Sequence, residues 1–232
     1  MARKIKIDNA TLKKFSRNEN KRKAGGKPLR KYYLIVCEGK KTEPNYFISL
    51  KDKLPKGVAN IEIVGEGKNT LSLLDKVISI RDRREKGMGG RKFDHVWAVF
   101  DRDSFPDDHF DNAISRGQSL KPQINCAWSN ESFELWYLLH LEFIDTPVKR
   151  QDFEYRIERK LTELTGKKFS YSKNREDMYD ILQRYGNETQ AITRAEFLEN
   201  KFEDFRYHTH NPCTRLHVLI KALNELKKNH HS

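Results

Sequence analysis

The chain has 232 residues and a formal net charge of +12, from 45 Lys and Arg against 33 Asp and Glu. No apolar run approaches the roughly 20 residues that a membrane-spanning helix needs. The basic N-terminus also lacks the apolar segment of a signal peptide. We therefore expect a cytoplasmic protein without membrane contact, long enough for one domain with a substantial addition.

The positive charge is concentrated at the N-terminus. Twelve Lys and Arg but only two acidic residues lie in the first 31 positions, and the rest of the chain has 33 basic and 31 acidic residues. This asymmetry predicts that 1–30 is a basic, disordered arm that binds nucleic acid by neutralising phosphates, with contacts at Arg17, Lys21, Arg22 and Lys23. The alternative is a solvated leader that only keeps the protein soluble.

After the arm, short apolar runs alternate with helical patterns. The apolar runs predict four buried strands, at 32–37, 60–64, 94–100 and 123–128. Helices are expected at 42–51 with Thr42 as the N-cap, from residue 69 or 70 onward, at 107–117 and at 131–140. This order predicts an α/β fold with a mostly parallel four-stranded sheet flanked by helices on both faces.

The pattern changes after Pro147. Helical patterns follow one another at 151–164, 174–185, 188–204 and 213–229, and no further strand pattern of comparable strength is present. We therefore divide the chain into the arm (1–30), an α/β domain (31–146) and a helical C-terminal subdomain (147–232).

Acidic residues follow two of the predicted strands. Glu38 comes directly after the first strand, and Asp101 and Asp103 come at the end of the third. Open α/β sheets place their ligands beyond the carboxyl ends of their strands. Residues two apart in an extended chain point to the same side, so both aspartates can face one ion while Arg102 faces away. Clustered carboxylates repel one another unless they are protonated or share a cation, so we expect Mg²⁺ or Mn²⁺ there. The alternative is that Glu38 is an exposed turn residue, Asp101 caps a turn and Asp103 starts the next helix.

Other charged residues lie near the predicted strand ends. Lys40 and Lys41 are candidate phosphate contacts, or else ordinary surface residues. Glu43 is interpreted as a first-turn helix acid rather than a ligand. Glu134 stands in an apolar helical run, where an isolated charge is costly, and is therefore favoured as a site residue over Glu131.

Four segments carry a resemblance to known proteins. A strand ending in Glu38-Gly39 and another ending in Asp101-Arg102-Asp103 resemble the topoisomerase–primase (Toprim) domain. More specifically, the chain resembles the RloB-like family at 35–47, at 100–103, at 130–136 with His140, and at 211–214. Members of that family typically have Pro at the position of Glu131, so the resemblance favours Glu134 again.

The resemblance implies a function as well as a Toprim-like fold. It implies a metal-dependent nuclease that cuts phosphodiester bonds in RNA, tRNA included, or in DNA. Glu38 would be the general acid or base or a metal ligand, Asp101 and Asp103 would hold Mg²⁺ or Mn²⁺, and Glu134 would complete the catalytic set. It further implies an effector of antiphage defence, acting by abortive infection with an ABC/AAA-type ATPase partner. The alternative is a nucleic-acid-binding adaptor with a vestigial acidic site.

Overall fold

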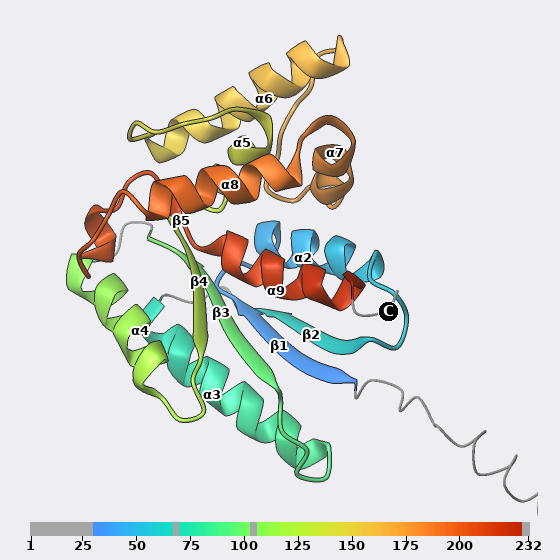
Figure 1. Cartoon of the computed structure of the whole chain (residues 1–232), viewed down its shortest axis with the longest axis vertical. Helices are drawn as coiled ribbons and strands as arrows, with labels where there is room; N and C mark the ends of the chain where they lie inside the picture. Colours follow the sequence, from blue (N-terminus) through green and yellow to red (C-terminus); the bar gives the residue numbers. More distant parts are fainter. Residues whose placement is uncertain (1–29, 67–69, 103–105, 229–232) are drawn as a thin grey trace, which may run out of the picture.

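The computed structural model describes residues 30–66, 70–102 and 106–228 (Figure 1). A five-stranded sheet with the order β2-β1-β3-β4-β5 forms its centre. The first four strands pair in parallel, which confirms the predicted α/β class. The strands are β1 (Lys31–Cys37), β2 (Ala59–Gly65), β3 (His95–Asp101), β4 (Asn125–Asn130) and β5 (Cys213–Thr214).

The fifth strand corrects the predicted sheet. Residues 213 and 214 were expected to begin a helix, but they pair antiparallel with the end of β4. The hydroxyl groups of Ser129 and Thr214 lie 2.9 Å apart and hydrogen-bond across this pairing. A strand of two residues is too short to produce an alternating pattern, so the sequence offers no signal for it.

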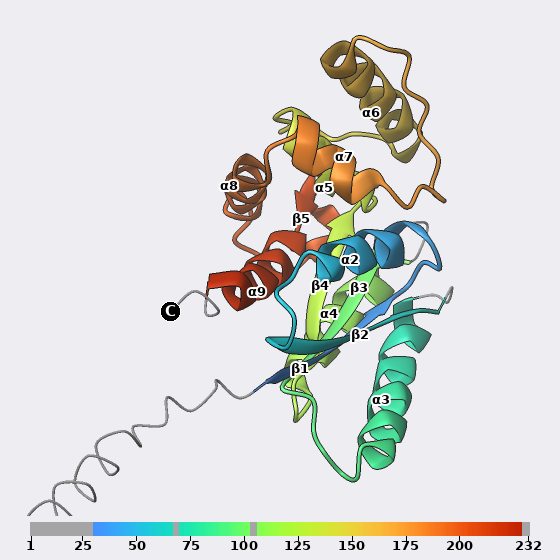
Figure 2. The same cartoon turned by 90° about the vertical axis from the view of Figure 1, so that its right-hand side faces the viewer.

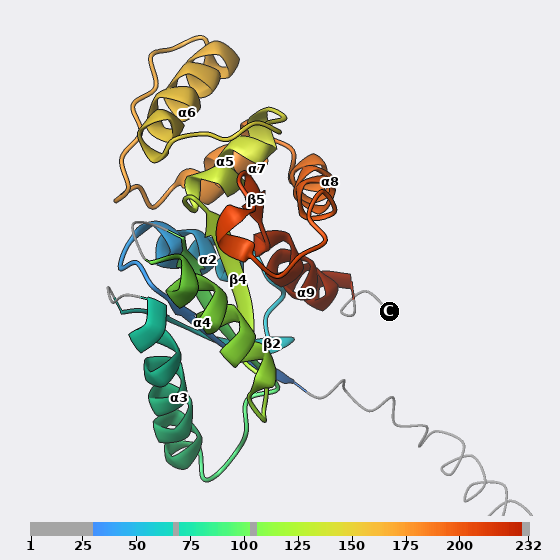
Figure 3. The ribbon, with the colours of Figure 1, turned by 90° about the vertical axis from the view of Figure 1, so that its left-hand side faces the viewer.

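Helices cover both faces of the sheet, because successive strand residues point to opposite sides. Ile35 and Val99 pack on the face covered by α2 (Thr42–Asp52) and α9 (Leu216–Lys228). Val36 and Phe100 pack on the opposite face, against α3 (Thr70–Gly87) and α4 (Asp107–Ser119). Figures 2 and 3 show these two layers from opposite sides.

A second group of helices lies beyond the carboxyl ends of the parallel strands (Figures 1 and 2). Its members are α5 (Glu134–Leu141), α6 (Arg150–Thr165), α7 (Met178–Tyr185) and α8 (Glu188–Glu199). One hydrophobic cluster joins Trp136 of α5, Phe153 of α6 and Leu219 of α9 to the sheet face under α2. The domain boundary at 147 stays a prediction, but residues on both sides of it share this core.

The predicted helix bounds differ most where loops carry polar contacts. Helix α7 begins at Met178 rather than at 174, and the carbonyl groups of 173–176 instead accept hydrogen bonds from α2. Helix α8 ends at Glu199 rather than at 204. Among the described residues, none of the helices has the length and apolar character to cross a bilayer.

Candidate active site

The ends of β1 and β3 lie side by side at the carboxyl edge of the sheet. The N–H of Glu38 donates to the carbonyl oxygen of Val99 at 2.8 Å, which continues the pairing of β1 with β3. The N–H of Asp101 donates to Oε2 of Glu38 at 3.2 Å. The parallel pairing therefore brings these two acids, 63 positions apart in sequence, into contact.

A cavity of about 210 Å³ opens at this edge. Its acidic lining comes from Asp101, Glu43 at the start of α2 and Glu134 at the start of α5. The remaining lining residues are Gly39, Lys40, Lys41, Thr42, Phe133, Arg150 and Lys173. Acidic side chains and cationic side chains thus line the same cavity.

Asp101 is the most strongly perturbed carboxyl group in this cavity. Burial raises its pKa well above the usual range, and the charges of Glu43, Glu134 and Glu38 raise it further. A hydrogen bond from the backbone N–H of Phe133 opposes this effect only in part. Like charges held together in this way stabilise a bound cation or a bound proton.

Glu43 belongs to this acidic group, although the sequence pattern indicated only a helix first-turn residue. It does lie in the first turn of α2, but its side chain is buried. Burial is the largest effect on its pKa, which is raised, and the charge of Glu134 acts in the same direction. A Cβ atom at Gly39 would collide with the Glu43 carboxylate, so the glycine after Glu38 makes room for this fourth acid.

Glu134 and Glu131 have different surroundings. Glu134 is buried, and the hydroxyl of Tyr171 donates to its Oε1 at 2.9 Å. Glu131 instead accepts a hydrogen bond from the N–H of Arg150 at 3.0 Å and one from the amide of Asn211 at 3.4 Å. Glu134 therefore faces the cavity, while Glu131 joins the start of α6 to the segment before β5.

Three residues that line the cavity or contact its acids have no signal in the sequence patterns. Arg150 begins α6, and Tyr171 and Lys173 lie in the loop between α6 and α7. Their sequence distance from Glu38 hides their role, because only packing of the C-terminal helices brings them to the sheet edge. Thr42 was predicted to cap α2, which is wrong: Lys41 is the N-cap, and the Thr42 hydroxyl donates to the carbonyl of Lys173 at 3.1 Å.

The predicted site residues are thus only partly placed. Asp101, Glu134, Lys40 and Lys41 line the cavity, and Glu38 lies beside it in contact with Asp101. Asp103, Arg17 and Lys21–Lys23 lie outside the described residues.

The carboxylate oxygens suit a hard divalent cation. Desolvation and then the charges of Glu43, Glu134 and Glu38 raise the pKa of Asp101, and a cation would neutralise that charge. Within residues 30–66, 70–102 and 106–228, however, no three Asp, Glu, His or Cys side chains are already arranged as a metal centre. The chemistry of the carboxylate donors around the cavity therefore fits such an ion.

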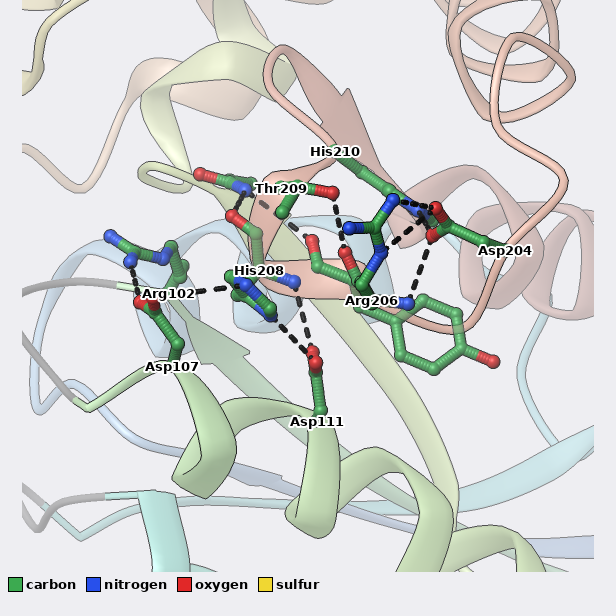
Figure 4. Close-up of polar contacts among 10 residues, drawn as sticks. Arg102, Asp107, Asp111, Asp204, Arg206, His208, Thr209 and His210 are labelled. Atoms are coloured by element: carbon green, nitrogen blue, oxygen red, sulfur yellow. Dashed lines mark hydrogen bonds and ion pairs between the residues drawn. The ribbon is translucent and has the colours of Figure 1, made fainter.

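A second polar cluster lies at the opposite side of the β3 end (Figure 4). Arg102 forms an ion pair with Asp107 at the start of α4. His208, in the short helix η1 (Tyr207–Thr209), contacts Asp111 through Nδ1 at 2.7 Å and Asp107 through Nε2 at 3.7 Å. This cluster attaches the segment before β5 to α4.

Near it, Asp204 is held by His210 and Arg206, at 2.9 and 2.8 Å respectively. These hydrogen bonds, first that of His210 and then that of Arg206, hold the pKa of Asp204 well below its usual range. Asp107, Asp111 and Asp204 therefore each have a cationic or imidazole partner.

The fold and the cavity define the class of protein: an α/β protein whose acidic site lies at the carboxyl edge of a mostly parallel sheet. The family model described as RloB-like protein matches residues 33–223, most of the chain. The chain therefore belongs to the RloB-like family, as its motifs indicated. Neither the curated proteins nor the solved structures contain a match to it.

Proposed function

We propose that this protein is a Mg²⁺-dependent nuclease that cleaves phosphodiester bonds in RNA or DNA. The observation that carries the proposal is the grouping of the half-buried Asp101 with Glu38, Glu43 and Glu134 at the carboxyl edge of the sheet. The position is the one where open α/β sheets bind ligands. Cationic side chains around the same cavity favour an anionic substrate.

Asp101 and Glu38, together with Asp103, would hold the ion. When bound, Mg²⁺ or Mn²⁺ supplies charge neutralisation at the scissile phosphate and lowers the pKa of water. Glu38 would accept the proton of the attacking water, and its orientation is fixed by the N–H of Asp101. Lys40, Lys41 and Lys173 would orient the phosphate at the cavity mouth.

Cleavage by purified protein tests this proposal. Asp101→Asn should remove all detectable Mg²⁺-dependent cleavage of labelled RNA and DNA, because it removes a ligand charge while conserving size. Asp108→Asn is the matched control, since Asp108 is an exposed acid in the first turn of α4. Cleavage by Asp101→Asn at the wild-type rate would contradict the site assignment.

The natural substrate can be identified in cells. RNA and DNA are sequenced from cells expressing the wild type and from cells expressing Asp101→Asn. Strand ends produced by cleavage should be present only in the cells with the wild type. Ends confined to RNA, tRNA included, or to DNA would define the substrate class.

A second candidate is a nucleic-acid-binding adaptor that does not catalyse. One observation favours it: the described acids do not form a ready-made metal centre. Calorimetry separates the two candidates, because a nuclease should bind Mg²⁺ or Mn²⁺ near millimolar concentration. An adaptor should bind neither ion, and its salt-sensitive binding of nucleic acid should disappear when residues 1–30 are removed.

We further propose, on family membership, that the protein is a cytoplasmic effector of antiphage defence that acts with an ABC/AAA-type ATPase. Cells carrying the wild type together with the proposed ATPase partner should resist phage, and cells carrying Asp101→Asn with the same partner should not. Co-purification of the full chain with that ATPase tests the partnership. Equal phage resistance of both strains would contradict the effector role.

A further inference from the structure

A second, larger cavity adjoins the acidic cavity. It has a volume of about 490 Å³ and is lined by Lys149, Arg150, Gln151, Glu154 and Lys173. Arg150 and Lys173 also line the acidic cavity, so the two spaces share one wall. A ligand bound at Asp101 can therefore continue past these two side chains into the second cavity.

The lining of the second cavity favours an anion. Lys149, Arg150 and Lys173 contribute three positive charges, whereas Glu154 contributes a single negative charge. Glu154 lies 4.0 Å from Nζ of Lys173, and both side chains are about half exposed. An ion pair this long and this exposed contributes little free energy, so a phosphate can displace it.

The cations are held by elements packed against the acidic cavity. The loop that carries Lys173 is attached to α2 through the Thr42 hydroxyl, which donates to the Lys173 carbonyl at 3.1 Å. Asn45 of α2 donates to the carbonyl of Asn174 at 3.3 Å. Arg150 is positioned by its N–H, which donates to Glu131 at 3.0 Å. The backbone positions of these cations are thus fixed relative to Asp101.

We propose that the second cavity binds a non-scissile phosphate of the same nucleic-acid strand that is cut at Asp101. The inference rests on the proposed function, because it places the two cavities along one strand. Lys149 and Lys173 contact this phosphate, and Arg150 lies between it and the scissile phosphate. The residues after 147 therefore contribute substrate contacts, in addition to those predicted for the arm.

Salt-dependent binding of nucleic acid tests this site without requiring catalysis. The probe is a short fluorescein-labelled single-stranded RNA, titrated with the full-length protein in EDTA at several salt concentrations. Each phosphate contact on a single strand contributes about 0.7 to the slope of log affinity against log salt. Lys149→Ala with Lys173→Ala should lower the slope by about that amount and weaken binding severalfold. Thermal unfolding of the variant should match wild type, since both side chains are exposed or half-exposed.

Matched control variants are available on the same chain. Lys168→Ala changes an exposed lysine near Lys173 that lines neither cavity, and Lys86→Ala changes one at the end of α3. Both controls should bind as the wild type does. An unchanged slope in the double variant, an equal decrease in the controls, or no binding by wild type would overturn the proposal.

The two proposals can fail separately. A reduced slope in the double variant with no cleavage by wild type would retain the phosphate site and reject the nuclease. Mg²⁺-dependent cleavage with an unchanged slope would retain the nuclease and reject the second phosphate site.

Discussion

The carboxylates on the two sides of the β3 end have opposite kinds of neighbours. On one side Asp101 is grouped with other carboxylates, and both burial and their charges raise its pKa. On the other side Arg102 pairs with Asp107, and Asp111 pairs with His208 (Figure 4). The last residue of β3, Asp101, thus belongs to a repulsive cluster, and the next residue in the chain, Arg102, belongs to a paired cluster.

This difference in charge pairing distinguishes a candidate active site from a contact that only stabilises the fold. Paired charges join α4 to η1 and stabilise the fold, because each carboxylate has a donor. Grouped carboxylates destabilise the fold at neutral pH and are tolerated where a ligand compensates them. Charge pairing therefore identifies the cavity at Asp101, rather than the His–Asp cluster, as the candidate active site.

The largest expected effect is acid destabilisation through His140, which lies in the same helix as Glu134 of the acidic cavity. His140 of α5 is buried; its Nδ1 donates to the carbonyl of Trp136 at 2.9 Å, and its Nε2 has no hydrogen-bond partner among the described residues. Burial lowers the pKa of His140 from 6.5 to about 4. Between these two pH values His140 is protonated in the unfolded chain but not in the folded chain. The free energy of unfolding therefore falls as the pH drops from about 6.5 to 4.

The loss should reach about 3 kcal/mol at pH 4, given 1.36 kcal/mol for each pH unit between the two pKa values. Urea unfolding of wild type and His140→Leu between pH 7 and 4 measures it. The variant should lose that much less stability on acidification than the wild type does. Parallel pH curves for wild type and His140→Leu would contradict this account.

Removal of a paired acid should destabilise the protein. Asp111 accepts hydrogen bonds from both the N–H and the Nδ1 of His208, at 2.9 and 2.7 Å. Asp111→Ala should therefore cost about 2 kcal/mol in the free energy of unfolding. Asp108→Ala, an exposed acid on the same helix, is the control and should change stability little. Equal stability of the two variants would show that the paired cluster does not stabilise the fold.

A smaller effect is expected at the phenol that contacts Glu134. Tyr171→Phe retains the buried ring but removes the hydroxyl that donates to Glu134 at 2.9 Å. The loss should be about 1 kcal/mol in stability, with a weaker Mg²⁺ response because Glu134 is less well oriented. Tyr155→Phe is the control, since Tyr155 is 65% exposed. Identical melting and Mg²⁺ titration curves for the two variants would exclude a positioning role for Tyr171.

Much of the fold could be predicted from the sequence because its strong patterns are local. The runs that became β1 and β3 are short, apolar and end in acids, and parallel pairing then places Glu38 beside Asp101. The strand β5 could not be predicted, since its two residues form a strand only through pairing with β4.

The acidic group and the cavity walls were less predictable. The preference of the first helical turn for acids is enough to explain Glu43 from the sequence. Its position among the acids of the cavity was therefore not predicted. The available signal was the glycine at position 39, because a side chain there would collide with the Glu43 carboxylate. Lys173 reaches the cavity, and Tyr171 reaches Glu134, only because a loop packs on α2 and α5, which no local pattern encodes.

The central claim is that Asp101 is held among like charges for a cation, and thermal unfolding of Asp101→Asn tests it most directly. Without divalent ions, Asp101→Asn should unfold at a higher temperature than wild type, since the repulsion is removed; each kcal/mol gained corresponds to roughly 2–4 °C for a chain of this size. Millimolar Mg²⁺ should then raise the unfolding temperature of wild type but not that of Asp101→Asn. A variant that unfolds at or below the wild-type temperature, with both proteins responding equally to Mg²⁺, would contradict the account.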